Sequence, residues 1–102
     1  MNSKILTLLG FAARAGKLAF GMDAASFALK GKKSHLIVVA ADTSAKSRKE
    51  IGFFAEKAGI KVIDLTFSGQ ELSHAVGKKC GILSVNDESF ASGVCKAIDE
   101  TI

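Results

Sequence analysis

A glycine turn before a helical segment and a pair of lysines before a strand are the features of this chain whose residue types suit chemistry. Gly21 stands directly before a segment with helical spacing, so a partner can approach the backbone closely and meet the free N–H groups of the helix start. Lys78 and Lys79 follow Gly77 in a second loop, directly before an apolar strand. N–H groups and ammonium groups both bind phosphates and base edges, so the two loops predict a nucleic-acid site.

The positive charge of the chain is concentrated in its first half. Residues 1–49 contain nine Lys and Arg and two acidic residues, a balance of +7, whereas residues 50–102 contain five Lys and Arg and eight acidic residues, a balance of −3. A basic field on one side attracts a polyanion such as RNA. The alternative is a solvated, lysine-rich surface that binds no partner, and charge alone leaves both interpretations open.

The segment from Gly10 to Lys17 invites comparison with a nucleotide-binding loop, but its spacing does not fit. A P-loop has four residues between its glycines and a Ser or Thr after its lysine, whereas here five residues separate Gly10 from Gly16 and Leu18 follows Lys17. We interpret Gly16 instead as the residue that ends a helix, with Lys17 near the negative end of the helix dipole.

Catalytic and metal-binding arrangements have little support in the sequence. His74 lies in a short helical segment with no activated serine near it, and the carboxylates form no paired motif. Cys80 and Cys95 are fifteen positions apart, and His35 and His74 stand at no ligand spacing from them, so two reduced thiols are expected rather than a zinc site. We therefore expect no catalytic residue, no metal and no cofactor, and a protein that is not an enzyme.

Hydrophobic spacing and capping residues predict five helices that alternate with four strands. Helices are expected from Ser3 to before Gly16, from Asp23 to Lys30, from Thr43 or Ser44 to Ala58, from Ser68 to before Gly77, and after Asn86 or Asp87; strands are expected at Leu18–Phe20, Leu36–Ala40, Val62–Leu65 and Ile82–Val85. This alternation favours an α/β fold, a three-layer α/β/α sandwich with a largely parallel sheet. Its centre is predicted to contain Leu36, Val38, Val62, Ile63, Ile82 and Val85.

Length and composition indicate one domain over residues 1–102. The longest uncharged apolar run is far shorter than the roughly 20 residues that span a bilayer, and the N-terminal segment reads as an amphipathic helix rather than a signal peptide, so we expect a cytoplasmic protein without membrane contact. All seven aromatic residues are phenylalanine, and most are expected in the core. Because Tyr, Trp and any RNP-like aromatic run are absent, RNA recognition is expected to depend on backbone, lysines and loop shape rather than on base stacking.

Several sequence blocks resemble the kink-turn RNA-binding ribosomal protein superfamily, of the L-seven-Ae and L-thirty-e type. The blocks are Leu9–Leu18, Gly21 with the helix behind it, His35–Ser44, Glu71–Lys78 and Asp87–Ala91. They cover nearly the whole chain in order, and the LGFAARAGKL block is most similar to the bacterial YlxQ-like branch. The resemblance implies an α/β/α sandwich with a mixed, mostly parallel four-stranded sheet. It also implies that RNA is held by the loop that opens the second helix and the loop before the last strand.

The first of these loops departs from the superfamily pattern G-T-N-E-x-x-K. Gly21 matches the glycine, but Met22, Asp23, Ala24 and Phe27 stand where threonine, asparagine, glutamate and lysine are usual. Taken alone, Asp23 can also be interpreted as a helix N-cap. Ala24 and Phe27 have no hydrogen-bonding group in their side chains, and a base contact is worth about 1–3 kcal/mol. The resemblance therefore implies weaker binding of kink-turn RNA than the usual pattern gives.

These observations predict a non-catalytic RNA-binding protein of ribosomal-protein type. It would bind structured, kink-turn-like RNA, with ribosomal RNA as one candidate, and act as a monomer. The residues expected at the RNA are Arg14, Lys17, Gly21, Met22, Asp23, Ser26, Lys30, Lys32, Lys33, Lys78 and Lys79. The alternative is a protein-interaction module on the same fold with weakened or lost kink-turn recognition. Exposure of Phe27 would favour a protein partner, and burial would indicate a packing substitution.

Overall fold

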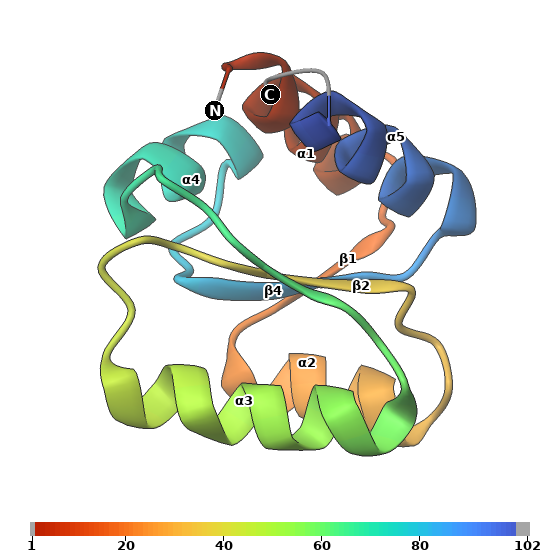
Figure 1. Ribbon diagram of the computed structural model, residues 1–102. Coiled ribbons are helices and arrows are strands. Elements are labelled where there is room, and N and C mark those ends of the chain that lie inside the picture. The colour runs from red at the N-terminus through yellow and green to blue at the C-terminus, as the bar shows by residue number, and fades with distance from the viewer. Residues whose placement is uncertain (1, 100–102) are drawn as a thin grey trace.

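The structure, a computed structural model, describes residues 2–99 (Figure 1). The predicted domain of residues 1–102 therefore extends at both ends beyond the described part. Along the chain the elements are α1 (Lys4–Arg14), β1 (Leu18–Phe20), α2 (Met22–Lys30), β2 (Leu36–Val39), α3 (Ala45–Ala58), β3 (Val62–Asp64), α4 (Gly69–Val76), β4 (Ile82–Val85) and α5 (Glu88–Asp99). All nine predicted elements are thus confirmed in order and type.

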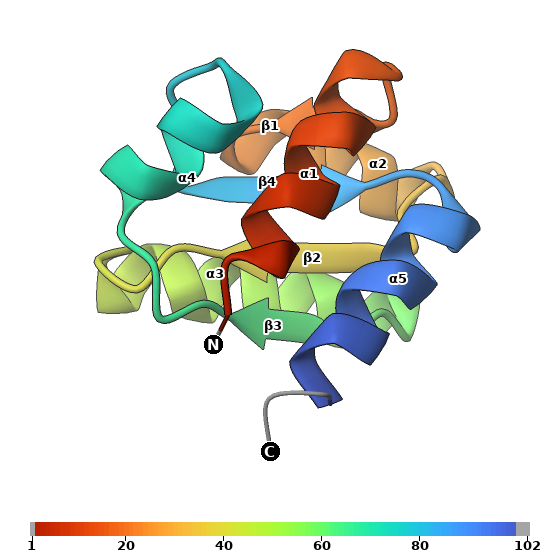
Figure 2. The same cartoon turned by 90° about the horizontal axis from the view of Figure 1, so that it is seen from above.

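The four strands form one mixed sheet in the order β1-β4-β2-β3. β2 pairs with β3 in parallel, whereas β4 pairs antiparallel with both β1 and β2. Three strands therefore run in one direction, and β4 runs between them in the other (Figure 2). The predicted mixed sheet is confirmed, but "mostly parallel" describes only the strand directions, because β2–β3 is the one parallel pair in the described sheet.

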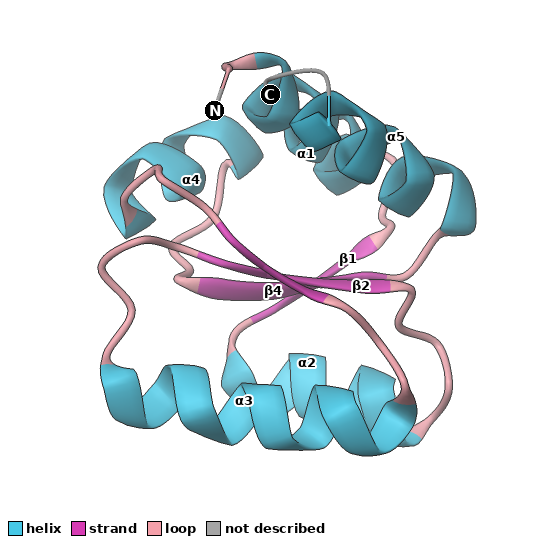
Figure 3. Cartoon of the chain, in the orientation of Figure 1, coloured by secondary structure: helices cyan, strands magenta, loops and turns pink. Residues whose placement is uncertain are grey.

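Two helical layers enclose the sheet, as the predicted sandwich requires (Figure 3). α2 and α3 cover one face, and α1, α4 and α5 cover the other (Figures 1 and 3). Successive residues of β2 alternate between the two layers: Leu36 and Val38 pack among α1, α4 and α5, while Ile37 and Val39 pack against α2 and α3. Every residue of β2 is buried, as its continuous apolar run predicts.

Most of the predicted core is confirmed, with two corrections. Leu36, Val38, Ile63, Ile82 and Val85 are buried, but Val62 is only partly buried because β3 lies at the edge of the sheet. The expectation for the phenylalanines is wrong, since none of the seven is fully buried: Phe11, Phe27 and Phe53 are exposed, and Phe20, Phe54, Phe67 and Phe90 are partly buried. The core is filled instead by Ile, Leu, Val and Ala, and the rings lie at its margins.

The helix starts follow local capping chemistry in three of five cases. Ser44 accepts a hydrogen bond from the Ser47 amide at 3.2 Å, and Ser68 forms the predicted capping box with Glu71. Asp87 accepts from the Phe90 amide at 2.9 Å. The other two starts differ from the expectation. Ser3 makes no side-chain cap bond, and Asp23 is not an N-cap, because α2 begins one residue earlier with Gly21 in the cap position.

Gly10 allows α1 and α4 to pack closely. A Cβ atom at this position would lie 2.9 Å from the Ala75 carbonyl oxygen, closer than side-chain carbons approach backbone. This glycine, which invited comparison with a nucleotide loop, therefore has a packing role. It sets the position of α4 and so of the loop that follows α4.

Candidate nucleic-acid interface

The two loops singled out in the sequence meet where β1 ends and β4 begins, and this side of the sheet is called the loop edge below. β1 ends at Phe20, which is paired with Leu83, and the Gly21 amide donates a hydrogen bond to the Ile82 carbonyl oxygen at 2.8 Å. Across the same edge, the Lys78 ammonium nitrogen lies 5.1 Å from the centroid of the Phe20 ring. The loop after β1 and the loop before β4 adjoin because these strands are antiparallel. If the two strands were parallel, these loops would lie at opposite ends of them.

Gly21 opens α2 in a conformation that other residues rarely adopt. Its φ is +92°, and α2 starts without any side-chain cap. A Cβ atom added here would meet nothing within 4 Å, so the dihedral angle and not crowding requires glycine. Open space therefore lies beside an uncapped helix amino terminus, where N–H groups are available to an anion or a base edge.

The side chains of this first turn supply little positive charge. Asp23 is exposed in the first turn, where its carboxylate suits the helix dipole but repels an approaching phosphate. Ser26 is partly buried, and its hydroxyl donates to the Met22 sulfur at 3.8 Å. Cations at this edge must therefore come from the second loop, where Lys78 and Lys79 are both exposed.

Ser73 fixes the shape of the lysine loop. Its hydroxyl oxygen accepts from the Cys80 amide at 2.9 Å and donates to the Cys80 carbonyl at 3.1 Å. Beyond it, the Gly81 carbonyl accepts from the Ala40 amide at 2.8 Å and from the Thr43 hydroxyl at 3.2 Å. The loop is thus tied to α4 and to the end of β2 while its two lysines face solvent. Nothing in the sequence spacing identified Ser73 as this positioning residue.

The other candidate cations lie elsewhere. Arg14 ends α1 and Lys17 precedes β1, about 13 Å from Gly21 at the usual rise of a strand, and the Lys17 carbonyl accepts from Asn86 at the far end of β4. Lys32 and Lys33 follow α2 at that same far edge. The sequence placed all these cations around the two loops, and the structure does not bring them together. Lys30 is in the last turn of α2, next to Lys32 along the chain and at the other end of the helix from Gly21.

Phe27 is the most exposed aromatic residue of the described chain. It is 72% exposed on α2, one helical turn after Asp23. Met22 and Phe20 are only partly buried, and Met22 packs against the cluster between α2 and α3. From the sequence, exposure of Phe27 is expected to favour a protein partner, and the ring is exposed.

Metal-binding and membrane-spanning features are absent from residues 2–99. No three His, Cys, Asp or Glu side chains within that range are grouped as a metal would require. None of the described helices, of which α3 with 14 residues is the longest, combines the length and apolarity needed to cross a membrane. Cys80 and Cys95 are both free thiols, and burial raises the pKa of the Cys80 thiol.

Known proteins share both the sequence pattern and the fold. The model of the Ribosomal protein L7Ae/L30e/S12e/Gadd45 family matches residues 3–94. The RNA-binding protein YlxQ of Enterococcus faecium is 27% identical over 98 residues, which are 96% of this chain and 94% of YlxQ. The large ribosomal subunit protein eL30 of Candida glabrata is 32% identical over 81 residues, or 78% of this chain and 77% of eL30.

Solved structures agree with this match. A protein of unknown function from Bacillus halodurans C superposes with a TM-score of 0.90 at 27% identity, covering 96% of this chain and 99% of its own. The Giardia lamblia 15.5kD RNA binding protein superposes with a TM-score of 0.79 at 15% identity, covering 100% of this chain and 93% of its own. At that identity the second likeness concerns the fold alone.

Proposed function

The chain belongs to the Ribosomal protein L7Ae/L30e/S12e/Gadd45 family, and from that premise we propose that it is a non-catalytic, cytoplasmic protein that binds structured RNA. Two of its relatives are, by name, an RNA-binding protein and a large-subunit ribosomal protein. The observation that carries the proposal is the junction of the Gly21 turn and the Lys78–Lys79 loop at one edge of the sheet. Kink-turn-like RNA, in ribosomal RNA among others, is the proposed ligand.

The two loops would make different contacts with the RNA. The uncapped start of α2 presents N–H groups to base edges or phosphate oxygens, and Gly21 leaves room for the backbone of the RNA to approach. Lys78 and Lys79 contribute charge to the opposite wall of this edge and offset the repulsion from Asp23. The anchored loop around Ser73 holds those lysines near the turn before RNA arrives, which lowers the ordering cost of binding.

The affinity is expected to be modest. Ala24 and Phe27 replace two side chains that read bases in the superfamily pattern, at about 1–3 kcal/mol each. Together that loss corresponds to roughly 30-fold to 10⁴-fold in the dissociation constant. Shape and backbone contacts would therefore contribute more to recognition here than base-specific hydrogen bonds.

A mobility-shift series tests the proposal. The full chain is titrated with a kink-turn RNA and with a plain hairpin of equal length at several salt concentrations. The proposal predicts tighter binding of the kink-turn RNA, with affinity that falls as salt rises. Equal affinity for both RNAs, or no binding to either, would contradict it.

A second candidate function rests on Phe27. A ring 72% exposed on a helix is an apolar anchor of the kind that protein interfaces bury. Under this alternative, α2 docks on a protein and the chain recognises RNA weakly or not at all. The two candidates make opposite predictions for Phe27→Lys, which would abolish protein docking but strengthen binding to kink-turn RNA.

A further inference from the structure

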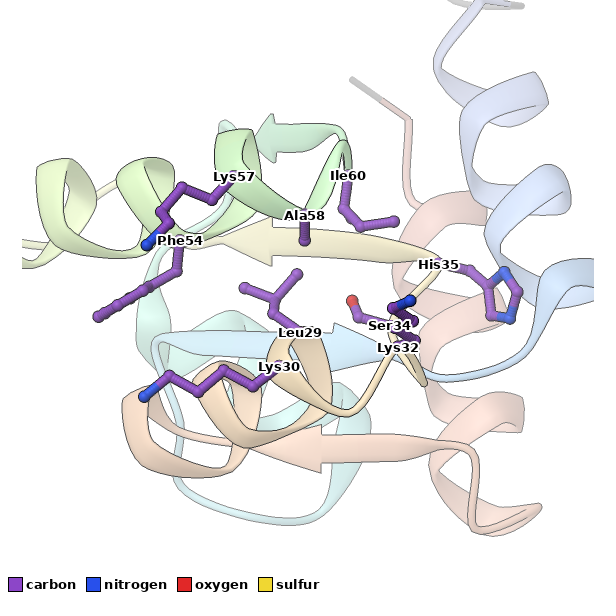
Figure 4. Close-up of a pocket in the computed structure, with 9 residues that line it drawn as sticks. All are labelled: Leu29, Lys30, Lys32, Ser34, His35, Phe54, Lys57, Ala58 and Ile60. Carbon is purple, nitrogen blue, oxygen red and sulfur yellow. The ribbon is translucent and has the colours of Figure 1, made fainter.

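We propose that the groove between the carboxyl-terminal halves of α2 and α3 binds an unpaired nucleotide. RNA that continues as a single strand beyond the structured element would then contact this face. The proposal deepens the proposed function and rests on it. The groove is lined by Leu29, Phe54 and Ile60 in its apolar part and by Lys30, Lys32 and Lys57 at its rim (Figure 4).

The size and floor of the groove suit a nucleobase. Its volume is about 590 Å³, within the range of small-molecule sites. Leu29 is 3% exposed and forms the floor from α2, while Ala58 and Ile60 close the side formed by α3 and the turn after it. Figure 4 shows the Leu29 side chain in the middle of the groove, with Phe54 at one end. The flat face of a nucleobase would displace water from these surfaces, while its polar edge can remain in solvent.

The charges around the groove select an anion. Three lysines and His35 line it, and no acidic residue does. The Lys30 ammonium nitrogen lies 5.2 Å from the centroid of the Phe54 ring, and that of Lys57 lies 5.4 Å from the centroid of Phe53. Within residues 2–99 neither ammonium group forms an ion pair with a carboxylate. Both ammonium groups therefore lie over aromatic rings rather than beside carboxylates. A phosphate can bind them at a small cost in free energy, because a cation–π contact at an exposed site is weak.

Aromatic rings beside lysines are the usual means of holding single-stranded nucleic acid. Phe53 and Phe54 stand edge to face with centroids 5.7 Å apart, so Lys30, Phe54, Phe53 and Lys57 form a continuous series from α2 to α3. Base–aromatic stacking is worth about 1–3 kcal/mol per base, and lysines bind the adjoining phosphates. The sequence-based expectation against a stacking platform rested on the absence of Tyr and Trp, whereas the structure leaves Phe53 exposed and Phe54 only partly buried.

The backbone at Lys32 adds a further sign of binding. Lys32 has a φ of +58°, a left-handed conformation in which glycine is usual, although Gly31 directly before it has a φ of −84°. The helix end thus places a lysine where glycine would be less strained. A side chain kept at a strained position on the rim of a groove is consistent with a role in binding.

The groove and the proposed RNA site lie at the two ends of one helix, α2. From Gly21 to Lys30 the helical rise amounts to about 13 Å, a length covered by about four stacked nucleotides at 3.4 Å each. The exposed Phe27 lies between them. A strand that leaves the Gly21 turn can therefore follow α2 past Phe27 and place a base in the groove. Because one helix takes part in both sites, a nucleotide of the bound RNA is favoured over an acidic peptide or an acyl chain.

The test compares RNAs with and without a tail. A blunt kink-turn RNA and the same RNA with a six-nucleotide single-stranded extension at either end are titrated against the full chain by fluorescence anisotropy. We expect one extension to tighten binding about five- to 100-fold. Phe54→Leu and Lys57→Gln should lose that gain and keep the affinity for blunt RNA, while Lys49→Gln, exposed on the same helix outside the groove, should keep both. No gain from either extension would overturn the proposal.

Amide NMR spectra of the ¹⁵N-labelled chain distinguish a nucleotide of RNA from a free nucleotide. They also distinguish failure of this proposal from failure of the proposed function. Adenosine and uridine monophosphate, inorganic phosphate, octanoate and an acidic peptide are each titrated alone. Shifts of the Leu29, Phe54 and Ile60 amides with the RNA tail support the proposal. Shifts with mononucleotides but not with the tail would make a free nucleotide the ligand and overturn it, as would shifts only with inorganic phosphate, octanoate or the peptide. These arms need no kink-turn binding, so loss of that binding alone refutes only the proposed function.

Discussion

The ammonium nitrogen of Lys78 lies 5.1 Å from the centroid of the Phe20 ring. This contact joins the last residue of β1 to the loop before β4, and it spans the edge at which RNA is proposed to bind. Because the amide of the next residue, Gly21, is also bonded to Ile82, the two loops are held together by backbone and by side chain. Each loop therefore limits the freedom of the other.

Removing the Phe20 ring should weaken RNA binding by releasing Lys78. Cation–π pairs at exposed sites are worth about 0.5–1 kcal/mol, so Phe20→Leu is expected to reduce affinity about two- to fivefold. The measurement is the dissociation constant for kink-turn RNA. Phe90→Leu, another partly buried phenylalanine but on α5, serves as the control. An equal loss in both variants would show that general packing and not the Lys78 contact is responsible.

Restoring the superfamily pattern should strengthen recognition of the kink-turn. Ala24→Glu with Phe27→Lys returns two side chains able to read bases, and each contact is worth about 1–3 kcal/mol. We expect a gain of roughly 30-fold or more in affinity for kink-turn RNA and little change for a plain hairpin. Parallel titrations of the two RNAs measure it. An unchanged affinity for the kink-turn would mean that the Gly21 turn does not face the bases.

Gly10→Ala should destabilise the protein through the α1–α4 contact. The added Cβ would lie 2.9 Å from the Ala75 carbonyl oxygen, so the two helices must separate, at a cost of about 1–3 kcal/mol. Urea unfolding measures the change. Gly93→Ala in α5 is the matched control, because its Cβ would meet only Leu8 at 3.8 Å and alanine favours helix. A Gly10→Ala variant as stable as the control would refute the packing role.

The Cys80 thiol should react more slowly than the Cys95 thiol in the folded protein. Cys80 is buried, and burial raises its pKa, so less of the reactive thiolate is present near pH 8. Iodoacetamide labelling followed by peptide mass spectrometry should find Cys95 modified first in the native chain, with equal rates in urea. Faster labelling of native Cys80 would contradict the burial.

The raised pKa of the Cys80 thiol should make the free energy of unfolding fall as pH rises. The folded state favours the neutral thiol, so the stabilisation from Cys80 is complete below the unfolded thiol pKa of about 8.5 and is lost as pH rises through the folded value. Urea unfolding at rising pH should therefore show a steeper loss of stability in the native chain than in Cys80→Ala.

Local chemistry made the elements predictable, but not their pairing. Ser44, Ser68 and Asp87 cap helices through neighbours within three residues, so the sequence carried these boundaries. The direction of β4 depends on contacts with β1 and β2, which lie far away in the sequence. The loop after β1 and the loop before β4 adjoin only because these two strands are antiparallel, and no local pattern in the sequence determines that pairing.

The candidate site was predictable only in part for the same reason. Charge per segment revealed a basic half, but the folded chain puts Lys17 at the opposite end of β1 from Gly21. The exposure of Phe27, which the sequence left open, and that of Phe53 depend on their places on helix faces, which hydrophobicity alone does not give. The groove between α2 and α3 depends on how two helices pack and left no pattern in the sequence.

The most direct test of the RNA site compares the Lys78–Lys79 pair with the Arg14–Lys17 pair, which lie at opposite ends of the paired strands β1 and β4. The salt dependence of kink-turn RNA binding is measured for the native chain, for Lys78→Gln with Lys79→Gln, and for Arg14→Gln with Lys17→Gln. Binding at the two loops predicts that the first pair lowers the log–log slope by about 1.8, one phosphate contact per lysine, and that the second leaves it unchanged. An unchanged slope in the first variant, or an equal drop in the second, would contradict the proposed site.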